Sequence, residues 1–222
     1  MIAEPAVAAT GSELVERLRA NRVATIDELH AINGVPTQAI REKHTSYLTP
    51  LLERFITAAP FFVIATADGE GNCDVSPKGD PPGAVRILDH RTIAIPDRLG
   101  NRRIDGHRNI VENPHIGLLF IIPNVDETVR VNGRAFISAD PELLASMAIQ
   151  GKVPKLAMII EIDEVYMHCA RAFLRAGMWK PETWPDPDTV PTLNAIRCEQ
   201  KELPPPDESV GKRQEEYRNV LY

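Results

Sequence analysis

The sequence predicts a mainly β protein with helices (an α+β fold), in which a small antiparallel barrel follows an N-terminal helical region. Apolar residues in the first 58 positions repeat at helical spacing. After Pro60 the period of the apolar residues becomes that of strands. Six or seven short strands are expected to follow, joined by short turns. One helix is inserted after the fourth strand, and this order is typical of a small closed barrel.

The helical region contains several separate helices. Ser12 can cap an amphipathic first helix, and a second is expected from Thr25. A third is expected from Pro36, after the Asn33-Gly34 break. Residues 47–58 carry a continuous apolar stripe, which predicts a fourth helix.

The barrel region begins with a hairpin, because the turn residues 68–72 separate two short β-type runs. Residues 78–83 read as a Pro/Gly loop. The expected strands are 61–67, 73–76, 84–88, 92–95, 116–122, 128–138 and 157–167, with further helices near 140–151 and 170–178. We therefore expect a helical region at 1–58, a barrel at 59–184 and a C-terminal tail or arm at 185–222, where Pro and charged residues accumulate.

Composition narrows the function classes. The net charge of −6 argues against nucleic-acid binding, because there is no basic excess to displace counterions. The longest apolar runs, 60–65 and 116–123, are too short to cross a membrane. The N-terminus has no basic start followed by an apolar stretch, and the three cysteines form no disulfide framework or metal spacing. These features predict a cytoplasmic location and no metal site.

Two neighbouring arginines stand at the expected start of the inserted helix. Asn101 can cap its first turn, Arg102 and Arg103 follow, and the helix closes at Asn113-Pro114. A helix N-terminus disfavours cations by about 0.3–1 kcal/mol each. The arginines fit there when an anion binds among them and the free N–H groups, so the spacing points to a phosphate site. The simpler alternative is surface ion pairs with Asp89, Asp97 or Asp105. One face of the helix is expected to carry Ile104, His107 and Val111.

Several strings from Phe61 to Trp179 together resemble the FMN-binding split-barrel superfamily of pyridoxamine 5′-phosphate oxidase. They also resemble a bacterial branch of probable FMN-dependent enzymes. The strings are residues 75–80 (VSPKGD), 82–89 (PGAVRILD), 95–103 (IPDRLGNRR), 112–120 (ENPHIGLLF), 129–135 (VRVNGRA) and 168–172 (HCARA), followed by Trp179. The resemblance implies a split β-barrel homodimer that binds one FMN in each of two interface clefts.

The resemblance also assigns residues to the cofactor, position by position. Arg86, with Ile87 and Leu88 on the same strand, matches the segment that reaches the phosphate and faces the flavin ring. Arg102 and Arg103 match the pair at the phosphate, next to Asn101. Pro96 and Asp97 match the strand end at the ring edge or ribityl chain, and Thr128 matches a longer glutamine. His168 and Arg171 lie near a ring-flanking position, and Ser76 and Lys78 are further candidates from the residues themselves.

The implied function is an FMN-dependent oxidoreductase acting on an unidentified small molecule, with no catalytic residue assigned. The oxidase's own C-terminal substrate-binding pattern is absent, so activity on pyridoxamine phosphate is not transferred. Three alternatives stay open: a flavin carrier without turnover, a haem-binding relative, and a relative that binds a deazaflavin. Lys78 can equally be a solvated loop lysine.

Overall fold

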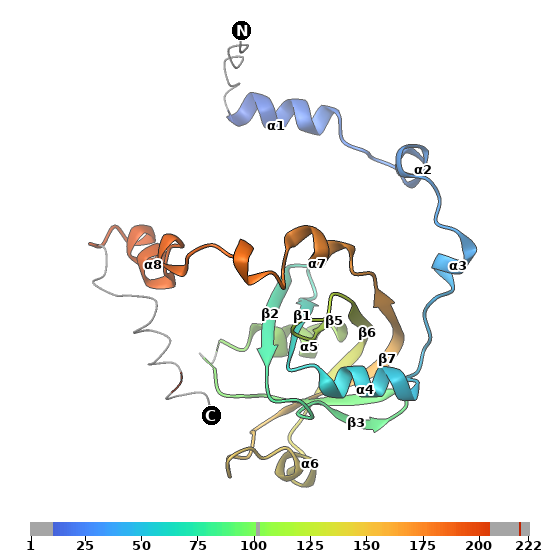
Figure 1. Cartoon of the computed structure of the whole chain (residues 1–222), viewed down its shortest axis with the longest axis vertical. Helices are drawn as coiled ribbons and strands as arrows, with labels where there is room; N and C mark the ends of the chain where they lie inside the picture. The colour runs from blue at the N-terminus through green and yellow to red at the C-terminus, as the bar shows by residue number, and fades with distance from the viewer. Residues whose placement is uncertain (1–10, 101–102, 205–217, 219–222) are drawn as a thin grey trace. The chain divides into compact units, whose positions relative to one another are not determined.

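Seven strands form one curved antiparallel sheet that carries most of the chain's buried residues (Figure 1). The computed structural model describes residues 11–100, 103–204 and 218, and the chain divides into two units, residues 1–43 and 44–222. The elements are α1 (Gly11–Ala20), α2 (Ile26–Asn33), α3 (Gln38–Arg41), α4 (Pro50–Ala58), β1 (Phe61–Ala67), β2 (Cys73–Gly79), β3 (Arg86–Asp89), β4 (Thr92–Pro96), α5 (Asp105–Glu112), β5 (His115–Ile121), β6 (Thr128–Ser138), α6 (Pro141–Ser146), β7 (Ala157–His168), α7 (Arg171–Ala176), η1 (Pro181–Thr183), η2 (Pro187–Thr189) and α8 (Leu193–Gln200).

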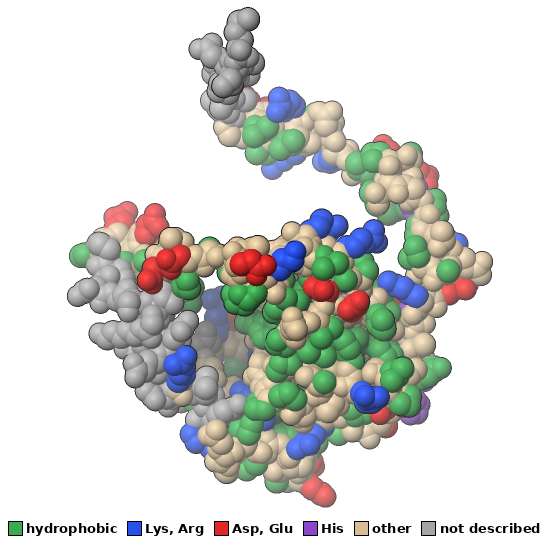
Figure 2. All heavy atoms as spheres, viewed as in Figure 1, with side chains coloured by type: hydrophobic (Ala, Val, Ile, Leu, Met, Phe, Trp, Pro, Cys, Tyr) green, Lys and Arg blue, Asp and Glu red, His purple; other side chains and the backbone are tan. Residues whose placement is uncertain are grey.

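The helices of the first unit are formed by local signals rather than by burial. Thr25 caps α2, because its side chain accepts from the Glu28 N–H while the Glu28 carboxylate accepts from the Thr25 N–H. None of α1, α2 and α3 contains a buried residue. Their apolar side chains are visible in green on the helix surfaces (Figure 2). The predicted N-terminal helices are therefore present, although Ser12 lies within α1 instead of capping it, and α3 begins at Gln38 and not at Pro36.

The fourth helix, α4, belongs to the second unit and packs against the sheet. The Thr49 side chain caps it, and Pro50 occupies its first turn, where the missing N–H costs nothing. Ile56 is fully buried and joins Leu48 in the main core. This burial holds α4 against the strands.

The strand order is β2-β1-β5-β6-β7-β4-β3, and among the described residues β2 does not pair with β3. The expectation of a closed barrel is therefore wrong, and the sheet is an open, split barrel. Both edge strands are poorly suited to further pairing. Pro77 lies in β2 and lacks an N–H, whereas β3 has four residues and a register shift between Ile87 and Asp89.

The central pair, β6 and β7, depends on one glycine. The register shifts between Asn132 and Gly133, and a Cβ built on Gly133 would lie 2.0 Å from the Glu161 carbonyl oxygen. No side chain fits at that distance. Glycine therefore permits the close approach of the two strands at this bulge.

Three local predictions near the arginine pair need correction. Lys78 and Gly79 belong to β2, not to a loop, because they pair with Phe62 and Phe61 of β1. Helix α5 begins at Asp105, after Ile104 in the left-handed conformation (φ 51°), so Arg103 precedes the helix instead of occupying its first turn. The buried face of α5 consists of His107, Asn109 and Ile110, while Ile104 and Val111 are exposed.

Candidate functional site

A large cleft of about 860 Å³ lies between β2, residues 97–100 and 103–107, and the segment from Lys152 to Leu156. This volume is within the range of about 300–1,000 Å³ that is typical of ligand sites. The Asp97 N–H donates to the Leu156 carbonyl oxygen at 2.9 Å, which ties two of the three walls together. The cleft is therefore built from segments that are far apart in the sequence.

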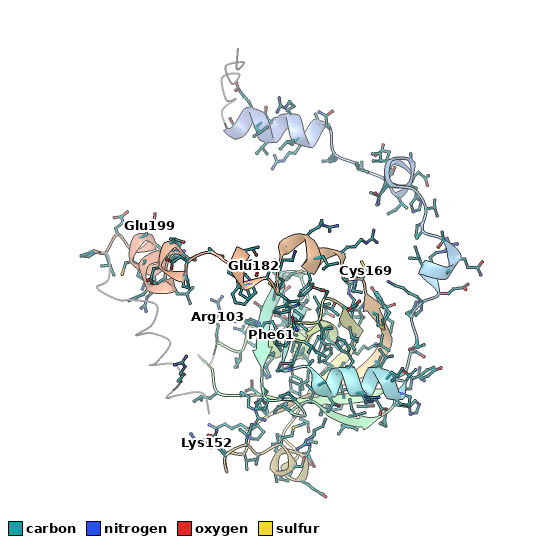
Figure 3. All side chains as sticks on the ribbon, in the orientation of Figure 1. Phe61, Arg103, Lys152, Cys169, Glu182 and Glu199 are labelled. Carbon is teal, nitrogen blue, oxygen red and sulfur yellow. The ribbon has the colours of Figure 1, made fainter. Side chains whose placement is uncertain are left out.

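Basic side chains outnumber acidic ones among the described residues that line this cleft. Five are basic: Lys78, Arg98, Arg103, Lys152 and Lys155. Three are acidic: Asp74, Asp97 and Asp105. Figure 3 labels Arg103 and Lys152, which lie on the same side of the sheet. A chain with a net charge of −6 thus gathers positive charge around one cavity.

Strand β2 forms one wall of the cleft, because the burial of its side chains alternates along the strand. Asp74, Ser76 and Lys78 are half-buried, whereas the residues between them are exposed. Because successive strand residues point to opposite faces, these three side chains share one face, and all three line the cleft. The candidates Ser76 and Lys78 are therefore brought together with Asp97.

Arg98 joins its wall of the cleft to two segments outside the cleft. Its Nε donates to Asp80 Oδ2 at 2.5 Å, and its Nη1 donates to the Met147 carbonyl oxygen at 3.0 Å. The Arg98 and Asp80 side chains are only 17% and 8% exposed. This arginine fixes the loop after β2 against the end of α6.

Arg103 lies at the exposed edge of the cleft, with 78% of its side chain accessible. Its Nε pairs with the Asp105 carboxylate, so one of the ion pairs considered from the sequence is present. The structure does not include Asn101 and Arg102 among its described residues. Of the two arginines predicted to bind a phosphate, only Arg103 is among the described residues.

His107 is a buried polar residue that lines this cleft. It is 8% exposed, and its Nε2 lies 3.5 Å from Asp97 Oδ1 without a hydrogen-bond partner among the described residues. Burial lowers the pKa of His107; the Asp97 carboxylate opposes this shift and the Lys78 ammonium adds to it. Asn109 on the same helix is satisfied, since its Nδ2 donates to Thr66 Oγ1 at 3.0 Å.

The β3 candidates lie outside this cleft. Arg86 Nη2 donates to the Ser146 carbonyl oxygen at 2.6 Å, and Arg86 lines a smaller cleft of about 330 Å³. Ile87 packs against the core and Leu88 is 46% exposed. Pro96 is buried at the end of β4, directly before Asp97. A single chain therefore does not bring Arg86 and Arg103 into one cavity.

The candidates near the ends of β6 and β7 form a second group. Thr128 and His168 are register partners, and Thr128 is 3% exposed. Arg171 Nε donates to Cys169 Sγ at 3.4 Å. Thr128, His168 and Arg171 do not line the large cleft.

The sequence did not single out His107, Asp74, Arg98, Lys152 or Lys155 as site residues. Two of these residues could have been found from sequence periodicity. Asp74 shares a strand face with Ser76, and His107 lies on the helix side that includes buried Ile110. Lys152 and Lys155 approach the other walls through the tertiary fold. No local pattern points to them.

The family model described as pyridoxamine 5′-phosphate oxidase matches residues 48–169, more than half of the chain. The chain belongs to this family. The resemblance inferred from the residues is confirmed, and the matched segment covers α4 and all seven strands. No curated protein matches the chain.

Three solved structures illustrate the similarity that a structural comparison finds. HupZ of Group A Streptococcus is 20% identical, with 53% of this chain and 91% of that chain covered and a TM-score of 0.43. General stress protein 26 of Bacillus anthracis str. Sterne is 14% identical, with 59% and 94% covered and a TM-score of 0.42. An F420 reductase is 17% identical, with 52% and 94% covered and a TM-score of 0.38. At these values none of them identifies the ligand of this chain.

Two further observations concern the described residues only. They contain no group of three or more His, Cys, Asp or Glu side chains placed to hold a metal ion. None of their helices combines the length and the apolar character needed to span a bilayer.

Proposed function

We propose that the protein is an FMN-dependent oxidoreductase of the pyridoxamine 5′-phosphate oxidase family that acts on a small organic molecule. The observation that carries this proposal is the basic cleft between β2, residues 97–100 and 103–107, and residues 152–156, in a chain that belongs to this family. The cleft has the size of a cofactor site, and its excess of basic groups suits a phosphate monoester.

The donor set fits a flavin nucleotide. Arg103 at the exposed edge offers a planar guanidinium for a phosphate, and Arg102 is assigned to the same role from the sequence. Lys78, Ser76 and Asp97 line the inner part of the cleft, where they can contact the rest of the cofactor. The bound flavin would supply the hydride chemistry, and the protein would supply binding, orientation and electrostatics.

The division of the candidates into separate groups supports a homodimer. Lys78, Asp97 and Arg103 line one cleft, whereas Thr128 and His168 lie at the paired ends of β6 and β7. We propose that two protomers join so that the second group completes the first across the interface. Sedimentation and light scattering test this directly: a monomer that binds one FMN per chain would contradict it.

Absorption spectroscopy and titration test the cofactor assignment. The purified protein is expected to show flavin absorption, or to bind added FMN, and to bind riboflavin more weakly because riboflavin lacks the phosphate. Equal affinities for FMN and riboflavin would overturn the phosphate assignment. A Soret band in place of flavin absorption, or selective binding of a deazaflavin, would overturn the choice of FMN.

Turnover separates the enzyme from a carrier. The FMN-loaded protein is mixed with a reduced nicotinamide under anaerobic conditions, and the flavin spectrum is followed before and after addition of candidate acceptors. Reduction and catalytic reoxidation are the expected results. A flavin that stays oxidised with every electron donor would favour a carrier.

A further inference from the structure

The most unusual polar group in the cleft is His107, because it is buried and faces a carboxylate without bonding to it. His107 is 8% exposed as a residue, and its Nε2 lies 3.5 Å from Asp97 Oδ1. Nε2 has no hydrogen-bond partner among the described residues. Buried polar atoms are normally satisfied, so an unsatisfied one suggests a second state in which it is paired.

Asp97 lies between His107 and the ligand space. The Asp97 side chain is 27% exposed, compared with 10% for the His107 side chain, and both residues line the cleft. The Nε2 atom itself is inaccessible to solvent. A ligand in the cleft therefore meets the carboxylate of Asp97 first, and His107 can act on that ligand through Asp97.

We propose that His107 is a positioning residue that holds Asp97 and sets the charge that the cleft presents to an anionic ligand. When His107 is neutral, Asp97 contributes an unbalanced negative charge to the cleft. When Nε2 carries a proton and pairs with Asp97, the two groups together are neutral. An anion is then bound more tightly, and by linkage the bound anion favours proton uptake by His107.

The surroundings of α5 limit which charges can control this pair. Helix α5 packs against β1, β2 and β6. Strand β1 carries no charged residue, β2 carries Asp74 and Lys78, and β6 carries Arg130 and Arg134. Among these groups and Asp97, the Asp97 carboxylate raises the pKa of His107 and the Lys78 ammonium lowers it, in addition to the dominant lowering by burial.

Arg130 and the charges on the helix itself complete the set. Arg130 Nη1 donates to the Tyr166 hydroxyl at 2.8 Å, so it is held on the β6–β7 pair. Asp105 on α5 pairs with Arg103, and Arg108 and Glu112 are the other charged residues of this helix. An anion that enters beside Lys78 would offset the ammonium charge, and this would raise the pKa of His107.

The first test needs no ligand. The side-chain ¹⁵N resonances of His107, assigned by their loss in His107→Gln, are followed through a pH titration. We expect a pKa below 6.5 in the wild type, a lower value in Asp97→Asn and a higher one in Lys78→Met. Asp163 is an exposed residue on β7, so Asp163→Asn is the control and should leave the pKa of His107 unchanged. A His107 pKa that is the same in the wild type and Asp97→Asn would overturn the pairing.

The second test rests on the proposed function and uses FMN, with uncharged riboflavin as its control. Dissociation constants are measured from pH 8 to pH 5.5 for the wild type and His107→Gln, so that titration of the phosphate itself cancels in their ratio. As the pH falls, the ratio of the wild-type affinity for FMN to that of His107→Gln should rise by about three- to tenfold. This is the size expected for one unit of charge acting across a solvated cleft. Riboflavin should show no such gain.

The two tests fail in different ways. A wild-type to His107→Gln affinity ratio for FMN that does not change with pH would overturn the effect on the ligand. If FMN binds neither protein at any pH, the proposed function is wrong, while the titration of His107 still decides whether Asp97 and His107 act as a pair.

Discussion

Replacement of Arg103 by alanine should weaken FMN binding while it leaves riboflavin binding almost unchanged. Arg103 lines the cleft with 78% of its side chain exposed, so its loss leaves no cavity in the core. Riboflavin differs from FMN only in lacking the phosphate. The ratio of the two affinities therefore isolates the interaction between the guanidinium and the phosphate.

The expected loss of FMN affinity can be estimated because Arg103 exchanges the Asp105 carboxylate for the phosphate when FMN binds. A charge-assisted hydrogen bond to phosphate stabilises by about 1.5–3 kcal/mol. The ion pair that Arg103 makes with Asp105 must yield, and a pair at such an exposed position contributes about 0–1 kcal/mol. The net loss in Arg103→Ala should be about 0.5–3 kcal/mol, or roughly 2- to 150-fold in the dissociation constant for FMN. Asp105→Asn should shift the affinity in the opposite direction, because it removes the competing carboxylate.

Quenching of flavin fluorescence on titration with protein measures both affinities. Arg54→Ala is the matched control, since Arg54 is an exposed arginine on α4 that does not line the cleft. The double variant Arg102→Ala/Arg103→Ala should release FMN almost completely from a folded protein. If Arg103→Ala keeps the wild-type ratio of FMN to riboflavin affinity, phosphate is not bound by this arginine.

Two further predictions concern the fold and a thiol. Gly133→Ala should lower the free energy of unfolding by about 1–3 kcal/mol in urea titrations, because the new Cβ meets the Glu161 carbonyl. Gly69 is the control: a Cβ there has open space, so Gly69→Ala should stay within about 0.5 kcal/mol of the wild type. The side-chain hydrogen bond from Arg171 lowers the pKa of the Cys169 thiol, so Cys169 should be alkylated by iodoacetamide at lower pH in the wild type than in Arg171→Gln. Equal alkylation profiles would show that Arg171 does not activate the thiol.

The strands were predictable where a single local signal decides them. Residues 61–67 and 128–138 were expected as strands, and β1 and β6 have those limits. Lys78 and Gly79 were expected in a loop because Pro and Gly surround them. Their pairing with β1 placed them in β2 instead, and such pairing depends on a neighbour that the local sequence does not contain.

The start of α5 shows a different limit. Asn101 is a good capping residue in sequence, yet α5 begins at Asp105 after a left-handed Ile104. A left-handed conformation at a β-branched residue is unfavourable, so no propensity rule predicts it there. The consequence for the site is direct, because Arg103 lies in the segment that enters the helix and not on the helix.

The candidate site was predictable only in part, because its walls come from separate regions. The sequence pointed to Ser76, Lys78 and Asp97, and these residues do line one cleft. Residues 152–155 reach the same cleft after the chain has passed through β5, β6 and α6. Periodicity can show that a lysine is exposed, but it does not show what the lysine faces.

The distribution of charge connects the cleft to the type of ligand it can accept. The chain has 25 basic and 31 acidic residues, and five of the basic but only three of the acidic ones are among the described residues around the cleft. The remaining 20 basic and 28 acidic residues give the rest of the chain an acidic balance. A compact anion can enter the cleft and meet the basic side chains that line it. The excess of basic side chains around the cleft therefore favours a small anion as its ligand, as the proposed function requires.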